Sequence, residues 1–364
     1  MQTLSGKIWL IDAGAFVLAL ISDMPDPLVH IPLYSADGVC DRDVRYMVEQ
    51  LLACLGSYFG HDNTYDVLVT TNDWRILEVL LAYQEKTRYP FQLRLVSRDE
   101  LRDAFHTNES RLRDSTCMRT IFSKFYPIMT RQSSAILHVD CDTIFLRKVD
   151  LSPLFVSAIG IVDGSQFEQS PLWCPTGSQA DFMGIAKPVR PVARWMNSGV
   201  FAVQGSGIKI CQREVRHYLE NLERARGDQL IHGNSDELIM NALALKERAA
   251  VTVLSDYGYN FVAYYLKYDP SWTQNAKIVH FHSFKPNFYR YRDGVVTSQC
   301  NKTQAQRLSD DLYLAVLMWF RHLHRACNAL RFDFPTLSAM PLEVVERELN
   351  KRRSAQISVN PRLS

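Results

Sequence analysis

The sequence predicts an α/β domain in which a mixed, mostly parallel sheet is flanked by helices. Short runs rich in apolar residues alternate with longer segments whose apolar residues recur at three- and four-residue spacing. Strands that alternate with helices in this way usually pair in parallel. The length of 364 residues fits one large α/β domain with an appendage. We expect an N-terminal segment at 1–24, a main domain at 25–295 and a helical C-terminal extension at 296–364.

Composition excludes several classes of protein. The chain is 47% hydrophobic and 22% charged, as in ordinary globular proteins. Its net charge of +2 creates no field that would attract nucleic acid, and we expect no nucleic-acid partner. The eight cysteines contain no C-x-x-C pair, so the sequence supports neither a zinc knuckle nor a disulfide framework. A reducing compartment follows, and we expect a cytoplasmic protein or one peripheral to a membrane.

Residues 8–21, IWLIDAGAFVLALI, are the one candidate targeting segment in the sequence. The run is too short for a comfortable membrane span, and Asp12 interrupts it. Lys7 precedes it, so a signal peptide or anchor is the alternative to a folded strand or helix. We favour the folded segment and expect no transmembrane span.

The first half of the chain begins its sheet at residues 28–34, LVHIPLY, followed by the small polar turn Ser35-Ala36-Asp37-Gly38. Doubly wound folds receive nucleotides at such a first loop. Apolar runs and helical periodicity then predict strands at 66–71 and 91–96, and helices at 44–59, 74–83 and 116–129.

The second half continues the alternation. Residues 164–194 form a long loop, typical of lids and binding loops. The pattern predicts strands at 158–163, 195–203, 251–254 and 276–284, and helices at 209–226, 234–245 and 304–330.

The stretch 135–146, AILHVDCDTIFL, carries the strongest chemical signal. An apolar run short enough for a buried strand leads into Asp140-Cys141-Asp142. Buried carboxylates without a partner are costly, so a cation should lie at the end of this strand. Two acids two residues apart can hold Mg²⁺ or Mn²⁺. The sequence therefore predicts a metal site at the carboxyl edge of the sheet.

A second D-x-D, Asp41-Arg42-Asp43, shows that the pattern alone is weak. This copy precedes a helical pattern, where an N-cap residue and a first-turn acid are favoured by the helix dipole. We interpret it as structural.

Other residues strengthen the site at Asp140 and Asp142. His280 lies in a predicted strand and could complete an oxygen and nitrogen ligand set, which favours Mn²⁺ over Mg²⁺. A core histidine is the alternative, and His282 leaves a zinc pair open. Lys124 and Lys285 suit a diphosphate, since lysine is a common partner of phosphate groups.

The order of these motifs resembles the glycogenin-like glycosyltransferases (glycosyltransferase family 8), which have the GT-A fold. The resemblance covers roughly residues 28–290. The matching residues are Lys124, Asp140-Cys141-Asp142, Asn197-Ser198-Gly199-Val200-Phe201, Asp236-Glu237 with Asn241, His280-Phe281 and Lys285-Pro286.

The resemblance implies a role for each matching position. Asp140, Asp142 and His280 would bind Mn²⁺, with Mg²⁺ as the alternative. The nucleotide and diphosphate would contact Ser35, Ala36, Asp37, Lys124, Cys141 and Lys285, and the donor sugar would face Arg119, Asn197, Ser198 and Asp236. Asp236 and Glu237 would be the catalytic residues. The chain departs from the family at Glu237, where Gln is usual, and at Ser283, where Gly is usual.

We therefore expect a metal-dependent glycosyltransferase that moves a sugar, with retention, from a UDP-sugar. The acceptor hydroxyl is left open among a glycan, a lipid-linked sugar and a protein. A sugar-nucleotide nucleotidyltransferase is the second hypothesis, although Ser35–Gly38 lacks the basic, glycine-rich loop that it should carry. The third is a nucleotide-sugar-binding module without activity. For Glu237, a nucleophile, a stabiliser of the transition state and a structural first-turn acid remain open.

Overall fold

The computed structural model describes residues 27–163, 182–184, 196–224, 235–282, 285–292, 295–298, 305–328, 330, 334, 336–337 and 340–359. The predicted N-terminal segment, with its apolar run at 8–21, lies outside these residues. So do most of the predicted loop at 164–194 and Ser283.

A seven-stranded sheet forms the centre of the fold, in the order β3-β2-β1-β4-β7-β6-β8. Every neighbouring pair is parallel except the two that involve β7, which is antiparallel to both β4 and β6. This confirms the predicted mixed, mostly parallel sheet. Its strands are β1 (Leu28–Leu33), β2 (Val67–Thr71), β3 (Phe91–Leu95), β4 (Ala135–Val139), β6 (Ile159–Asp163), β7 (Met196–Gln204) and β8 (Val251–Leu254).

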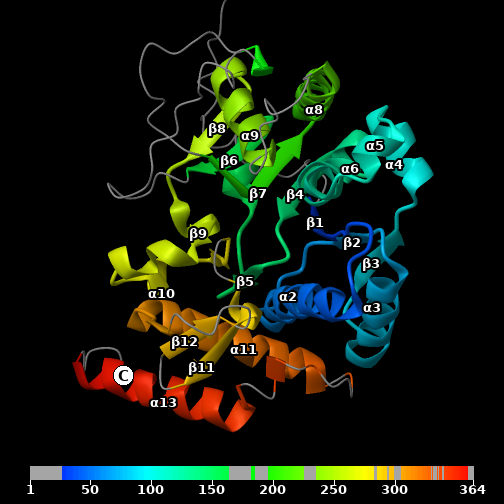
Figure 1. The fold of residues 1–364 in the computed structure, drawn as a ribbon. Helices are drawn as coiled ribbons and strands as arrows, with labels where there is room; N and C mark the ends of the chain where they lie inside the picture. The colour runs from blue at the N-terminus through cyan, green and yellow to red at the C-terminus, as the bar shows by residue number, and fades with distance from the viewer. Residues whose placement is uncertain are drawn as a thin grey trace, which may run out of the picture.

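Helices cover both faces of this sheet, as Figure 1 shows. On β4, Leu137 and Val139 pack into the core shared with α2, α3 and α11, whereas Ile136 packs into the core shared with α6, α8 and α9. Strands buried on both faces explain why their sequences are almost continuously apolar. The helices are α2 (Asp41–Gly60), α3 (Trp74–Thr87), α4 (Arg98–Phe105), α5 (Glu109–Leu112), α6 (Ser123–Met129), α8 (Ser206–Arg224), α9 (Ser235–Lys246), α10 (Trp272–Asn275), α11 (Asp310–Asn328) and α13 (Leu342–Val359).

The predicted strand at 276–284 is shorter than expected and lies outside the main sheet. It forms β10 (Ile278–His280), between β5 (Thr143–Phe145) and β9 (Phe261–Val262). In the antiparallel register with β5, His280 lies opposite Thr143, directly after Asp142. A further antiparallel sheet, which the sequence did not predict, consists of β11 (Tyr289–Arg292), β12 (Val295–Ser298) and β13 (Ala305–Arg307).

Shorter turns of helix connect these elements. Lys124 follows a π-helical turn, η1 (Cys117–Phe122), at the start of α6. The 3₁₀ turns are η2 (Ser152–Phe155), η4 (Tyr257–Tyr259), η5 (Ala263–Tyr268) and η6 (Pro286–Phe288). Among the described residues, no helix combines the length and the hydropathy that crossing a bilayer requires.

Helix α11 packs against α2, and α13 packs against α11. Trp319 and Phe320 of α11 are fully buried in the core that α2 also lines. The two helices approach closely at Gly56, where an added Cβ would lie 3.3 Å from the carbonyl oxygen of His322. A side chain at this position would therefore push the neighbouring backbone away by a few tenths of an ångström.

Glu49 of α2 is a buried carboxylate that links this helix to two distant segments. Its Oε2 accepts hydrogen bonds from Asn287 Nδ2 (3.0 Å) and from Thr336 Oγ1 (2.6 Å). Burial raises the pKa of Glu49 from 4.5 to about 7, although these hydrogen bonds oppose the shift. Glu49 is therefore a group whose protonation differs between the folded and unfolded states.

Glu49→Gln should remove a pH dependence of stability. Below the unfolded-state pKa, Glu49 is neutral in both states; as the pH rises towards the folded-state value, only the unfolded chain loses the proton, so stability falls. Relative to the variant, we expect the wild-type free energy of unfolding to fall by roughly 3 kcal/mol between about pH 4 and about pH 8. Urea denaturation of both proteins across this range measures the difference, and parallel profiles would contradict the assignment.

Candidate functional site

The topology gathers polar residues at one edge of the sheet. Asp140 comes directly after β4, at the carboxyl edge where α/β sheets bind ligands. Because β7 runs antiparallel to β4, the beginning of β7 lies at the same edge and brings Asn197 and Ser198 there. β10 adds His280 through its pairing with β5. Three segments that are distant in sequence therefore meet around Asp140.

Asp140, Asp142 and His280 form a compact cluster. One ligand atom from each lies within 4.8 Å of the others. His280 Nε2 is 3.2 Å from Asp142 Oδ1 and 3.6 Å from Asp140 Oδ2. Within the described part of the chain, this is the one group of three such side chains with metal-binding geometry. The structure thus brings together the three residues predicted to bind metal.

The charges of this cluster fit a divalent cation. Burial lowers the pKa of His280 to about 3, so its imidazole is neutral at neutral pH and can offer a lone pair. Burial alone would raise the pKa of Asp140, but Lys124 and His138 outweigh it and hold the carboxyl ionised. Carboxylate oxygens with one imidazole nitrogen suit Mn²⁺, and also Mg²⁺ completed by water.

His282 does not join His280 as a second nitrogen ligand. The two rings are nearly perpendicular, and His282 Nε2 lies 3.4 Å from Glu237 Oε1. Burial lowers the pKa of His282, but its contact with Glu237 prevails and raises it. The zinc pair that the sequence left open therefore has no support from this geometry.

Gly199 makes room for His280. A Cβ on Gly199 would lie 2.2 Å from His280 Cε1 and 2.9 Å from Asn197 Oδ1. These separations are far below van der Waals contact, so a larger residue would displace the imidazole. The glycine of the Asn197-Ser198-Gly199 motif thus has a steric role beside the cluster.

Lys124 lies between two acids. Its Nζ is 2.8 Å from Asp140 Oδ2, 2.6 Å from Asp236 Oδ2 and 3.1 Å from Ser198 Oγ. Burial would lower the pKa of Lys124, but Asp140 and Asp236 raise it overall. An ammonium has three N–H donors, and these three oxygens match them. Lys124 therefore couples the cluster to the first turn of α9.

The first turn of α9 carries Asp236 and Glu237, and both are buried. Asp236 Oδ2 accepts a 2.5 Å hydrogen bond from Ser198 Oγ. Glu237 Oε1 accepts a 3.1 Å bond from Asn197 Nδ2. Burial raises the pKa of Glu237, while His282 opposes the shift. The two predicted catalytic acids thus contact the two predicted donor-sugar residues of β7.

Lys285 and Cys141 flank the cluster. Lys285, just after β10, forms an ion pair with Asp142, and burial lowers its pKa to about 8. Burial raises the pKa of the Cys141 thiol to about 12, so this side chain stays protonated. Arg119 is exposed on η1 and forms no ion pair with the described residues, so the structure does not bring it into this network.

The predicted nucleotide loop lines a cavity of about 520 Å³ at the ends of β1, β2 and β3. The Asn72 amide holds the Ser35 backbone through bonds of 2.8 and 2.9 Å, and Ser35 Oγ donates to Asp73 Oδ2 (2.7 Å). Asp37 pairs with Arg98 at the rim. Ser35, Ala36 and Asp37 thus form part of the cavity wall. The Ser35 hydroxyl donates its proton to Asp73, so only its oxygen lone pairs face a ligand.

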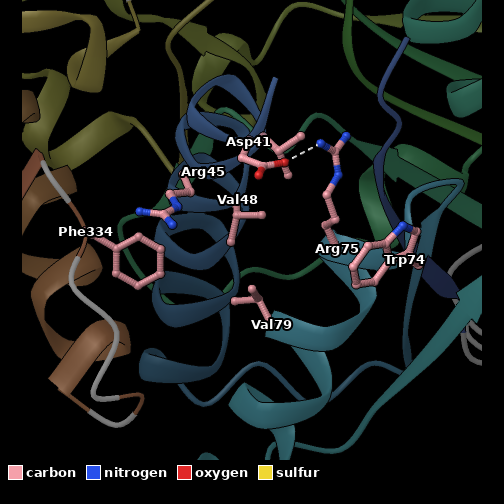
Figure 2. Close-up of a pocket in the computed structure, with 8 residues that line it drawn as sticks. Asp41, Arg45, Val48, Trp74, Arg75, Val79 and Phe334 are labelled. Carbon is pink, nitrogen blue, oxygen red and sulfur yellow. Dashed lines mark hydrogen bonds and ion pairs between the residues drawn. The ribbon is translucent and has the colours of Figure 1, made fainter. Parts of the chain in front are cut away.

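The other Asp-x-Asp lies on α2, in a different environment (Figure 2). Asp41 and Asp43 are both in the first turn, and the N-cap is Cys40, not an aspartate as predicted. Asp41 Oδ1 accepts a 2.6 Å bond from Arg75, beside a groove of about 420 Å³ with apolar walls. This arginine neutralises the acid, which supports a structural role.

Sequence reasoning missed two members of the site. His138 was a polar interruption of an apolar run, but its Nε2 lies 2.9 Å from Asp140 Oδ1. Asn260 was not singled out in the sequence, but its Oδ1 lies 3.1 Å from His280 Nδ1. A buried polar residue that needs a partner is the only sequence signal that could have indicated either.

Comparisons with known proteins give remote likenesses. No protein-family model and no curated protein matches the chain, so membership of the glycogenin-like family stays a prediction.

Among solved structures, the galactosyltransferase LgtC with donor and acceptor sugar analogues has 14% identity and a TM-score of 0.44, covering 73% of this chain and 90% of its own. An active-site mutant of LgtC, glutamine to glutamate, has 13% identity and a TM-score of 0.46, covering 86% and 99%. Mouse xyloside xylosyltransferase 1 has 13% identity and a TM-score of 0.44, covering 71% and 99%. Because these sequence identities and TM-scores are low, conclusions about function depend on the site alone.

Proposed function

We propose that this chain is a metal-dependent glycosyltransferase of the GT-A type, which transfers a sugar from a UDP-sugar to an acceptor hydroxyl. The observation that carries the proposal is the cluster of Asp140, Asp142 and His280 at the carboxyl edge of the sheet, in which Asp142 and His280 are buried and Asp140 is partly buried. The predicted nucleotide loop lies after β1, which is the neighbour of β4 in this sheet. A cation site and a nucleotide loop on adjacent strands suit a nucleotide diphosphate.

Each part of the site has a role in this proposal. Asp140, Asp142 and His280 would hold Mn²⁺ or Mg²⁺, which would supply Lewis-acid stabilisation to the leaving diphosphate. Lys285 would add positive charge at the diphosphate. Ser35, Ala36 and Asp37 would line the base and ribose, and Asn197, Ser198 and Asp236 would face the donor sugar. Fixing donor and acceptor together would lower the entropic part of the barrier.

Lys285→Ala should weaken UDP binding. If Lys285 donates a charged hydrogen bond to the diphosphate, its loss should cost roughly 1–3 kcal/mol, or about 5- to 150-fold in Kd. Isothermal titration with UDP and Mn²⁺ measures this change. Lys277→Ala is the matched control, because Lys277 lies just before β10 and pairs with Asp256 instead. Equal UDP affinity in the Lys285 variant and the wild type would show that Lys285 does not contact the diphosphate.

Turnover separates the proposal from its two rivals. The purified protein is incubated with Mn²⁺, a panel of nucleotide-sugars and a panel of acceptor hydroxyls, with water as the acceptor where none is added, and release of the nucleoside diphosphate is followed with and without chelator. We expect UDP release from a UDP-sugar that chelation abolishes. Pyrophosphate-dependent formation of UTP would indicate a nucleotidyltransferase. Stabilisation by UDP-sugar without turnover, detected as a rise in Tm, would indicate a binding module.

A further inference from the structure

A backbone group fixes the orientation of the Asn197 amide. The N–H of Gly199, which can only donate, lies 2.9 Å from Asn197 Oδ1, and Asn197 Nδ2 donates to Glu237 Oε1. Exchanging oxygen and nitrogen would place two donors together at one end and two acceptors at the other. The Asn197 oxygen therefore faces the interior of the site.

Asn260 is fixed in turn by Asn197. Its Nδ2 lies 3.3 Å from the backbone oxygen of Asn197 and 3.0 Å from Asn197 Oδ1, and both atoms only accept. The amino group of Asn260 must point at them, so its Oδ1 points the other way, toward His280. Asn260 is 1% exposed, so water cannot substitute for these partners.

His280 consequently meets acceptors on both ring nitrogens. Its Nδ1 is 3.1 Å from Asn197 Oδ1 and 3.1 Å from Asn260 Oδ1. Its Nε2 faces the carboxylates of Asp140 and Asp142. A neutral imidazole has a single N–H. Its other nitrogen therefore directs a lone pair at oxygen atoms that can also only accept, which is unfavourable. The arrangement is balanced when Nδ1 carries the proton and a cation lies between Nε2 and the carboxylates.

We propose that Asn260 is a positioning residue: together with Asn197, it holds the His280 proton on Nδ1 and so presents the Nε2 lone pair to the cation. The inference rests on the metal site of the proposed function. Asn260 reaches this position from the turn between η4 and β9, and β9 pairs with the His280 strand. The same small sheet therefore places the histidine and the residue that orients it.

The tautomer can be measured in metal-free protein. Protein with ¹⁵N-labelled histidine is studied by long-range ¹H–¹⁵N correlation, and His280→Gln identifies the signals of His280. We expect a protonated Nδ1 and an unprotonated Nε2 in the wild type. In Asn260→Leu, this single tautomer should be lost, and the Kd for Mn²⁺, measured by electron paramagnetic resonance, should rise about 10- to 100-fold.

Asn63→Leu is the matched control, because Asn63 is also a buried asparagine. Its side chain donates to the backbone oxygen of Tyr58 and accepts from the backbone N–H of Val149. It should destabilise the fold and leave the tautomer and the Mn²⁺ affinity unchanged. A wild-type His280 protonated on Nε2 would overturn the proposal, even if Asn260→Leu does not fold. So would an unchanged tautomer and affinity in that variant. Wild-type protein that binds no Mn²⁺ would overturn the metal site itself, while the tautomer would still test the role of Asn260.

Discussion

Asp142→Asn should abolish metal binding and sugar transfer. The substitution keeps the size of the side chain and removes a charge that faces His280 Nε2 over 3.2 Å. If the cation supplies about 4 kcal/mol of transition-state stabilisation, its loss should lower the rate about a thousandfold. Chelation of the wild-type protein should have the same effect, and Mn²⁺ should restore activity better than Ca²⁺. Both are measured as UDP release.

Asp142 also forms an ion pair, with Lys285, but the Lys285 side chain is partly exposed, so the loss of this charge should disturb the fold less than a change at Asp140. Asp140 also accepts from Lys124 and His138, so Asp140→Ala should lose activity but would also leave a buried lysine with one acid fewer. Asp41→Asn is the control, since it makes the same change in the other Asp-x-Asp and should keep metal binding and transfer. Full activity of the wild type in excess chelator, or a folded but inactive Asp41→Asn, would reverse the assignment.

Glu237→Gln should slow transfer by one to a few decades while Mn²⁺ affinity stays nearly constant. Glutamine keeps an acceptor for Asn197 Nδ2, so the contacts of Asn197 with His280 can persist. The substitution removes the negative charge beside Asp236 and His282. If the carboxylate stabilises positive charge on the sugar in the transition state, each tenfold loss of rate corresponds to about 1.4 kcal/mol of lost stabilisation.

The size of the effect separates the three hypotheses for Glu237. A nucleophile variant should lose nearly all transfer, because a covalent intermediate could no longer form. A structural acid should lose little. Glu214→Gln provides the control, because Glu214 of α8 is equally buried but pairs with Lys246, at the opposite end of α9 from Glu237. If Glu237→Gln transfers sugar at the wild-type rate, Glu237 has no catalytic role. The proposed function would then rest on the metal and phosphate residues.

The sequence predicted most of the main sheet because most of its strands are short runs rich in apolar residues, bounded by polar ones. For the same reason it located Asp140, Asp142 and the beginning of β7 correctly. It could not predict that β7 is antiparallel, since an apolar run specifies burial and not direction. It missed Asn260, because a single polar residue in a segment rich in apolar residues gives no indication of a partner 20 residues away. It missed His138 although its partner Asp140 is only two residues further along, because a histidine in a buried strand does not show which group it contacts.

The close contact of α2 with α11 at Gly56 has a consequence for expression of shortened chains. A chain that stopped before α11 would expose the apolar face of α2, and it would also leave Glu49 without its bond from Thr336. Exposed faces of this kind promote aggregation. Trimming of this protein for crystallisation should therefore stay clear of α11 and the segment around Thr336, although neither belongs to the proposed donor site.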